Sequence, residues 1–305
     1  MRVYYLANRH KSKQKKILVL GGTGSIGKSL IPKLISNNFN CFSISKKPSN
    51  ENLINNIQCD ITEFKKLNKI INKQKPDVII HLAGLVGNIK CEKNPKNAFL
   101  TNVIGTLNVL NASIKLKPKI IFISTGEIYG KTKNKASEKS NLRPTNVYGK
   151  TKMLSEILVQ NFTKNYQIPS IILRLSYCYS ENLSKKGFSL MFKNAIMGKK
   201  IQIFGGDQTV NLLHIDDAVD AIIKSIDYKK SGIFNIASSE TYNLISIIKK
   251  LNKIMNQKID YELLPYRGFE VKTSKLNINH SKKTLKFTPS KKLDEVLHTM
   301  VSKWK

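Results

Sequence analysis

The sequence predicts an α/β protein built on a doubly wound parallel sheet, with a smaller region after it. From Lys16 on, short continuous apolar runs alternate with stretches that have a helical period. Continuous apolar strands are typical of parallel sheets that carry helices on both faces. A glycine-rich turn, GGTGSIG, directly follows the first of these strands. The 305 residues are enough for one large domain or two tightly joined ones.

The elements of the first part follow one another along the chain. Apolar and β-branched residues dominate the expected strands KILVL, NCFSIS, NNIQCDI, DVIIHLAG, KIIFIST and PSIILRLS. Apolar residues recur at helical spacing in SLIPKLISNN, EFKKLNKIINKQ, NAFLTNVIGTLNVLNASIK and VYGKTKMLSEILVQNFTKNY. Helices between parallel strands supply the crossover connections that such a sheet requires.

The alternation weakens after Ser176, which suggests a change of architecture. Helical periods persist there in FSLMFKNAIMG, DDAVDAIIKSI, LISIIKKLNKIMN and the tail PSKKLDEVLHTMVSKW. We expect residues 17–176 to form the sheet domain and residues 177–305 to form mainly a smaller region, part of which can return to the sheet. Residues 1–16 contain many cations and no acid, and are expected to be a basic extension.

Charge and composition limit the classes of function. The formal net charge is +32, and such a field attracts polyanions. Lysine, however, occurs in nearly every segment, and neither an aromatic-and-arginine motif nor a Cys/His finger spacing accompanies it. We therefore expect no specific nucleic-acid partner and no metal, although the field would draw in a phosphorylated small molecule. No apolar run reaches about 18 residues, so we expect no membrane partner.

The cysteines and the first residues bear on location. Four cysteines lie far apart and form no C-x-x-C pair, which favours reduced thiols in a cytoplasm. Residues 1–16 lack the apolar centre of a secretory signal, although an amphipathic organelle-targeting segment remains an alternative. We expect a cytoplasmic protein.

The glycine-rich turn predicts a dinucleotide site of the Rossmann-like kind. Its glycines stand at G-x-x-G-x-x-G spacing between a strand and a helix, where the turn, the approach of a pyrophosphate and helix packing all favour glycine. The helix N-terminus then faces the anion. The turn residues expected to bind NAD or NADP are Gly21, Thr23, Gly24, Ser25, Ile26 and Gly27.

The end of the second strand is expected to contact the adenosine ribose. An acid there favours NAD, whereas a cation accommodates the 2′-phosphate of NADP. The chain has Ser45, Lys46 and Lys47 at this point and no acid, which favours NADP unless the lysines only reflect composition. Asp60 and Ile61, after the next strand, are placed to meet the adenine, although an aspartate at a strand end is also an ordinary turn residue.

Tyr148 and Lys152 are four residues apart, on one face of an expected helix. A phenol ordinarily has a pKa near 10, so it serves as a base at neutral pH only if a nearby cation stabilises the phenolate. Lys152 is placed to supply that cation. The helix follows the strand that ends in STGEIYG, which makes a chance Y-x-x-x-K less plausible.

These motifs together resemble the extended short-chain dehydrogenase/reductase family, specifically its NAD(P)-dependent nucleotide-sugar epimerases and dehydratases. The resemblance rests on GGTGSIG, HLAG, NVIGTLNVL, ISTGEIYG and YGKTK, and it covers nearly the whole chain after Lys16. It implies a triad of Thr125, Tyr148 and Lys152 that removes a hydroxyl proton while hydride passes between a sugar carbon and the nicotinamide. It also implies cofactor contacts from Leu82, Ala83, Gly84 and Asn102 as well as from Tyr148 and Lys152.

The residues after Thr125 depart from the dehydratase pattern. Nucleotide-sugar 4,6-dehydratases carry an Asp-Glu pair there, and related decarboxylases retain the glutamate. This chain has Gly126 and then Glu127, so a dehydratase of the paired-carboxylate type is not expected. Glu127 is a candidate catalytic residue that orients the substrate or acts as a base, and a purely structural carboxylate is the alternative.

The substrate half of the resemblance also has departures. Tyr177 in RLSYCYS stands where many relatives have an asparagine, and the segment is more similar to one in dTDP-4-keto-sugar reductases. Asn211 stands close to where an arginine that holds the diphosphate is expected, while Arg267 resembles the second such arginine. We expect Thr125, Tyr177, Asn211 and Arg267 to contact a nucleotide-sugar substrate.

The favoured function is a nucleotide-sugar epimerase or dehydratase type of enzyme, with a 4-epimerase as its simplest form. The alternative is an NADPH-dependent reductase of a 4-keto nucleotide sugar, and a third is a non-catalytic dinucleotide- or RNA-binding protein on this fold. The resemblance also implies a homodimer that packs the helices around TNVIGTLNVL and YGKTKMLSEIL. Their apolar residues Val103, Leu107, Leu110, Leu154 and Leu158 permit this packing or belong to the core.

Overall fold

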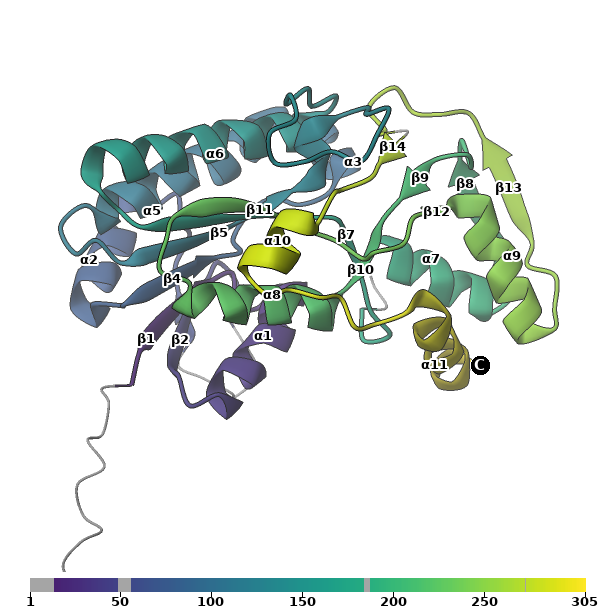
Figure 1. Cartoon of the computed structure of the whole chain (residues 1–305), viewed down its shortest axis with the longest axis horizontal. Coiled ribbons are helices and arrows are strands. Elements are labelled where there is room, and N and C mark those ends of the chain that lie inside the picture. The colour runs from purple at the N-terminus through teal and green to yellow at the C-terminus, as the bar shows by residue number, and fades with distance from the viewer. Residues whose placement is uncertain (1–13, 49–55, 184–186, 272) are drawn as a thin grey trace, which may run out of the picture.

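A parallel seven-stranded sheet forms the centre of the molecule (Figure 1). The computed structural model describes residues 14–48, 56–183, 187–271 and 273–305, so most of the expected basic extension lies outside the described residues. The strand order is β11-β6-β5-β4-β1-β2-β3, and the predicted doubly wound sheet is confirmed. The strands are β1 (Lys16–Leu20), β2 (Asn40–Ser45), β3 (Asn56–Gln58), β4 (Val78–His81), β5 (Lys119–Thr125), β6 (Ser170–Leu175) and β11 (Gly232–Ile236).

Helices cover both faces of the sheet because its strands are apolar on both sides. Figure 1 shows α1 (Ser25–Ser36) and α8 (Ile215–Asp227) on one face. The other face carries α2 (Phe64–Gln74), α5 (Gly105–Ser113) and α6 (Val147–Tyr166). Successive strand residues point to opposite faces, so one face of each strand packs in each core. A helix-covered sheet of this kind buries nearly every strand side chain, which is what the continuous apolar runs predicted.

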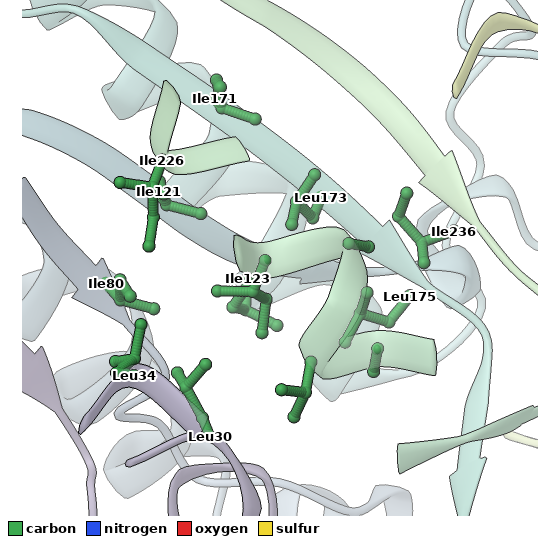
Figure 2. Close-up of a cluster of buried hydrophobic side chains, with 14 of the residues drawn as sticks. Leu30, Leu34, Ile80, Ile121, Ile123, Ile171, Leu173, Leu175, Ile226 and Ile236 are labelled. Carbon is green, nitrogen blue, oxygen red and sulfur yellow. The ribbon is translucent and has the colours of Figure 1, made fainter. Parts of the chain in front are cut away.

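Alternate side chains of β5 belong to two different buried clusters, one on each face of the sheet. Ile121 and Ile123 pack with Leu30 of α1 on one face, in the cluster that Figure 2 shows. Ile120 and Phe122 pack with the helices of the other face. Burying such a side chain fully contributes about 1.5–3 kcal/mol, so the two clusters fix the helices on the sheet.

The chain after Ser176 builds a smaller part beside the sheet and also returns to the sheet (Figure 1). Its β11 and α8 join the main layers, so this segment contributes to both parts. A third apolar core holds the smaller part together. The elements of the smaller part are β7 (Tyr177–Tyr179), α7 (Gly187–Ile196), β8 (Ile201–Phe204), β9 (Thr209–Val210), β10 (Leu212–His214), β12 (Tyr242–Asn243), α9 (Leu244–Met255), β13 (Tyr261–Leu264), β14 (Thr273–Ser274) and α11 (Leu293–Trp304). The short helix α10 (Asn279–Thr284) packs instead on β11 of the main sheet.

The sheet order places a crevice at the carboxyl end of β1. From β1 the chain builds outward through β2 and β3 on one side, and through β4 and β5 on the other. Ligands of open α/β sheets bind outside the carboxyl ends of the strands at such a switch point. Short helical segments border it, namely α3 (Asn88–Lys93), α4 (Pro95–Phe99), a π-helical turn at Leu100–Ile104 and a 3₁₀ turn at Gly126–Tyr129.

One buried ion pair joins α6 to the sheet. The Arg174 guanidinium of β6 donates to both carboxylate oxygens of Glu156 on α6, at 2.7 to 3.2 Å, and both side chains are almost fully buried. Arg174 also donates to the Tyr129 hydroxyl at 2.7 Å, and that hydroxyl donates to Asn235 on β11. The pair therefore connects the helix, the turn after β5 and two strands.

Glu156→Gln should destabilise the protein by about 3–5 kcal/mol, because it leaves the buried Arg174 cation without its counter-charge. Thermal or urea unfolding measures the loss. Glu295→Gln is the matched control, because Glu295 faces the exposed Lys292 at 3.9 Å and such surface pairs contribute little. Equal stabilities of the two variants would contradict the structural role of the buried pair.

Candidate active site

The glycine-rich turn leaves no space for side chains. Gly21 has a φ of +87°, and a Cβ atom there would lie 2.8 Å from the Ala83 backbone nitrogen. A Cβ atom on Gly27 would lie 2.4 Å from the Gly22 carbonyl oxygen. The following helix α1 begins without a side-chain cap and without an acid in its first turn. Its first N–H groups are therefore available to an anion such as a pyrophosphate.

Three buried polar atoms without a partner lie at the carboxyl ends of the neighbouring strands. They are His81 Nδ1 at the end of β4, Ser124 Oγ near the end of β5, and Ser176 Oγ just after β6. Buried polar groups are normally hydrogen-bonded, so unpaired ones along the edge of a crevice indicate a place for a polar ligand. The glycine turn and this edge together fit a dinucleotide cofactor.

His81 has a defined tautomer. The single proton of the Thr106 hydroxyl is donated to the Asn102 carbonyl at 2.6 Å. Thr106 Oγ1 must therefore accept in its contact of 3.1 Å with His81 Nε2, so the histidine carries its proton on Nε2. Burial, with the nearby Lys152 charge, lowers the pKa of His81 to about 3 and keeps the ring neutral. His81 Nδ1 is then a lone acceptor.

The residues expected at the adenosine end lie together. The buried Ser45 hydroxyl accepts a hydrogen bond from the Thr23 N–H at 3.2 Å. Lys46 forms an ion pair of 2.8 Å with Asp60. Burial raises the pKa of Asp60, but hydrogen bonds from Lys46 and Thr62 outweigh it and hold that pKa below its usual value. Lys46, which is a candidate to bind the 2′-phosphate of NADP, is thus already paired with Asp60. Lys47 is exposed.

Asn102 joins the end of β4 to α6 from the π-helical turn. Its side chain exchanges hydrogen bonds with the Leu85 backbone at 2.7 and 3.1 Å, and donates to the Thr151 hydroxyl at 2.9 Å. The segment Leu82–Gly84 lies between Asn102 and the glycine turn, since a Cβ atom on Gly84 would be 3.0 Å from Asn102 Oδ1. Ile61 lies against Gly105 at the start of α5. The segment Leu82–Gly84, Asn102 and the glycine turn therefore lie together beyond the carboxyl ends of β1 and β4, and their contact with a cofactor stays a prediction.

Thr125 is the last residue of β5 and lies beside the first turns of α6, which carry Tyr148 and Lys152. The Thr125 and Tyr148 hydroxyls are hydrogen-bonded to each other, and Thr125 Oγ1 also accepts from the Glu127 N–H at 3.2 Å. Burial and the Glu127 charge raise the pKa of Tyr148, so the phenol is protonated unless a cation assists it. Burial lowers the pKa of Lys152 to about 7, partly opposed by Glu156. The ammonium lies 4.0 Å above the Phe122 ring centre.

Glu127 is a buried carboxylate held by neutral donors. Asn146 donates to Glu127 Oε2 at 2.7 Å, and Asn88 and the Tyr177 hydroxyl also bond to the carboxylate. Burial raises the pKa of Glu127, and these three hydrogen bonds oppose that rise. Within the described part of the chain, no ion pair reaches Glu127.

Gly126 is packed tightly against the Leu276 side chain. A Cβ atom there would lie 3.0 Å from Leu276 Cδ1, tighter than an ordinary contact. The buried Leu276 would have to move before an aspartate could stand beside Glu127. The site therefore has one carboxylate on this turn.

The predicted substrate residues have different surroundings. The Tyr177 hydroxyl bonds to Glu127, and the Tyr177 ring packs edge-on against Phe188. The Arg267 guanidinium stacks 3.8 Å from the Phe204 ring centre and bonds to Glu270. Asn211 is fully buried, and its amide bonds to the backbone of Ser238, Glu240 and Leu276. The side chain of Asn211 thus has a scaffolding role, and its contact with substrate stays a prediction.

Sequence reasoning missed Asn88 and Asn146, although both bond to Glu127. An asparagine directly before a predicted helix is a common N-cap, and this signal marks Asn146. In the described ranges, no cluster of three or more His, Cys, Asp or Glu side chains could hold a metal ion. The same ranges contain no helix long and apolar enough to cross a membrane.

Comparisons with known proteins identify the family of this chain. The family model of the NAD dependent epimerase/dehydratase family matches residues 17–237. UDP-glucuronic acid decarboxylase 3 of Arabidopsis thaliana is 26% identical across 93% of this chain and 87% of its own length. The dTDP-D-glucose 4,6-dehydratase of Dictyostelium discoideum is 32% identical across 80% of this chain and 62% of its own. The structure of UDP-glucuronic acid 4-epimerase from Bacillus cereus, in complex with UDP-glucuronic acid and NAD, superposes with a TM-score of 0.87 at 26% identity, covering 95% and 100% of the two chains.

The resemblance inferred from the motifs is thereby confirmed. The matched region begins at β1 and ends just after β11, so it contains the glycine turn, the crevice and the Thr125, Tyr148 and Lys152 side chains. The chain is an enzyme that belongs to the NAD dependent epimerase/dehydratase family.

Proposed function

We propose that this protein is a nucleotide-sugar 4-epimerase that uses NAD. The observation that carries the proposal is the set of Thr125, Tyr148 and Lys152 near the buried carboxylate of Glu127, with a tightly packed glycine at position 126 in place of a second acid. A 4-epimerase needs one group that moves a hydroxyl proton, whereas elimination of water needs a further acid and base. The site therefore favours epimerisation over a paired-carboxylate dehydratase reaction.

Tyr148 moves the proton in the proposed reaction. Thr125 and Tyr148 together bind the hydroxyl on sugar carbon 4, and the Tyr148 phenolate takes its proton. The Lys152 ammonium stabilises the phenolate, because an adjacent cation lowers the pKa of a phenol. A nicotinamide held by the glycine turn would supply the hydride acceptor, and inversion requires that the hydride be given back to the opposite face of carbon 4. Tyr148 finally gives the proton back, so the protein ends each cycle unchanged.

The substrate end of the proposal rests on Arg267 and Tyr177. A planar guanidinium makes two hydrogen bonds to a phosphate at once, so Arg267 is the proposed ligand of the diphosphate. It lies partly exposed between Phe204 and Glu270. Tyr177, which bonds to Glu127, would face the sugar. The UDP-glucuronic acid in the Bacillus cereus epimerase complex supports a UDP sugar as the first substrate to try.

The second candidate is an NADPH-dependent reductase of a 4-keto nucleotide sugar. Lys46 and Lys47 at the end of β2 favour it, since cations accommodate a 2′-phosphate. The ion pair between Lys46 and Asp60 weighs against it, because that charge is already balanced. The NAD in the Bacillus cereus complex also supports NAD here. A cytoplasmic location accords with the four free cysteines.

Tyr148→Phe should lower the rate of inversion at carbon 4 by 10²-fold or more, because it removes the general base. The assay incubates UDP-glucose with the protein and follows UDP-galactose by NMR, without added cofactor. Tyr166→Phe is the control, because Tyr166 is an exposed tyrosine at the far end of the same helix. Wild-type activity in Tyr148→Phe would overturn the mechanism, and no inversion by the wild type with any UDP or dTDP hexose would overturn the function.

Lys152→Met should move the acidic limb of the kcat profile to higher pH by one unit or more. Burial and Glu127 already raise the pKa of Tyr148, and the loss of a nearby ammonium that favours the phenolate would raise it further. Rates from pH 5 to 10 provide the test. Lys150→Met, at an exposed lysine two residues before Lys152 on the same helix, should keep the wild-type profile. An unchanged limb in Lys152→Met would show that the lysine does not assist Tyr148.

A homodimer is part of the proposal, and the outer face of α6 is its proposed interface. Leu154 and Ile157 are 38% and 52% exposed there, and Phe99 and Leu100 of the adjoining α4 and π-helical turn are also exposed. Clustered exposed apolar side chains favour a protein partner. Val103 and Leu110, expected as interface candidates, are buried within this chain, so they are not available to a partner.

Ile157→Glu should convert a dimer to a monomer, because it places a charge in the centre of this face. Light scattering after size exclusion gives the mass. Ile35→Glu, at a 42% exposed position on α1, should leave the mass unchanged. A monomeric wild type at micromolar concentration would contradict the proposed assembly.

A further inference from the structure

Asn146 occupies a junction between the catalytic helix and the smaller part of the molecule. It is 1% exposed and directly precedes α6, two residues before Tyr148. Its side-chain oxygen accepts a hydrogen bond from the Gly149 N–H at 2.7 Å, which caps the helix. That bond uses only the oxygen, so the two N–H donors of the amide remain for other partners.

Both donors have partners in other segments. One bond runs to Glu127 Oε2 at 2.7 Å, on the turn after β5. The other runs to the Phe269 carbonyl at 3.2 Å, in the loop after β13. One buried side chain therefore connects the start of α6, the buried carboxylate and a loop more than 120 residues further along the chain.

The loop that Asn146 reaches carries Arg267. The Arg267 guanidinium lies 3.8 Å from the Phe204 ring centre and 5.5 Å from the Phe269 ring centre. It also donates to Glu270 at 2.8 Å. The position of Arg267 thus depends on a short segment whose backbone is tied to the catalytic helix through the Phe269 carbonyl.

We propose that Asn146 is a positioning residue that couples the Arg267 loop to the catalytic helix, so that diphosphate binding at Arg267 and the placement of Tyr148 and Glu127 depend on each other. This inference rests on the proposed function for the role of Arg267. A cap alone does not require asparagine, because serine and aspartate cap helices about as well. The two amide donors are what asparagine adds at this position.

Asn146→Ser tests the coupling, because serine keeps the cap and lacks the two donors. With UDP-glucose as the probe, we expect KM to rise at least fivefold, by more than kcat falls. In an Arg267→Met background the same substitution should change KM less than twofold, because the coupled group is gone. Equal changes of KM in both backgrounds, or a wild-type KM in the single variant, would overturn the proposal.

A second readout does not need turnover. Trypsin cleaves after Arg267, and release of the Gly268 end can be followed by mass spectrometry on the folded protein. Asn146→Ser should accelerate this cleavage at least fivefold, because the loop has lost its bond to α6. Asn243→Ser is the matched control, since Asn243 caps α9 through a bond of 2.9 Å to the Ile245 N–H. Cleavage at the control's rate would overturn the proposal.

The two proposals fail in different ways. Absence of carbon 4 inversion by the wild type removes the proposed function, and the proteolysis comparison then decides the coupling by itself. Inversion by the wild type with an unaltered KM in Asn146→Ser removes the coupling and leaves the proposed function intact.

Discussion

The docking of α6 against the ends of β5 and β6 is the constraint on which the site depends. Tyr148 and Lys152 are on this helix, while Thr125 and Glu127 come from the strand and turn that it covers. The buried pair of Glu156 and Arg174 holds the helix from the sheet side. Without this docking, the hydroxyls of Thr125 and Tyr148 would not meet, and Lys152 would not be buried beside them.

The sequence was sufficient to predict the sheet and the glycine turn after its first strand, because these depend on local patterns, whereas the triad stays a prediction. Continuous apolar runs specify buried strands, and the spacing of Gly21, Gly24 and Gly27 follows from close backbone contact. The partners of charged and amide side chains were not predictable. Lys46 pairs with Asp60 across two strands, and Asn88, Asn146 and Tyr177 converge on Glu127 from separate segments. Such contacts depend on tertiary packing, which no local pattern contains.

Burial gives the groups of the site their chemical character. It raises the pKa of Tyr148 and lowers the pKa of Lys152 to about 7. The same burial leaves Glu127 dependent on three neutral donors. A phenol and an ammonium on one helix, with a single carboxylate on the turn after β5, suit the reversible movement of one proton that the proposed 4-epimerase reaction requires.

The most direct test of this account is the identity of the nucleotide that the protein carries. Freshly purified protein is denatured, the released cofactor is identified by mass spectrometry, and the intact protein is titrated with NADH and NADPH. We predict retained NAD, because an epimerase regenerates its cofactor within each cycle. A protein that is empty and prefers NADPH would contradict the account and would indicate a reductase that consumes its cofactor.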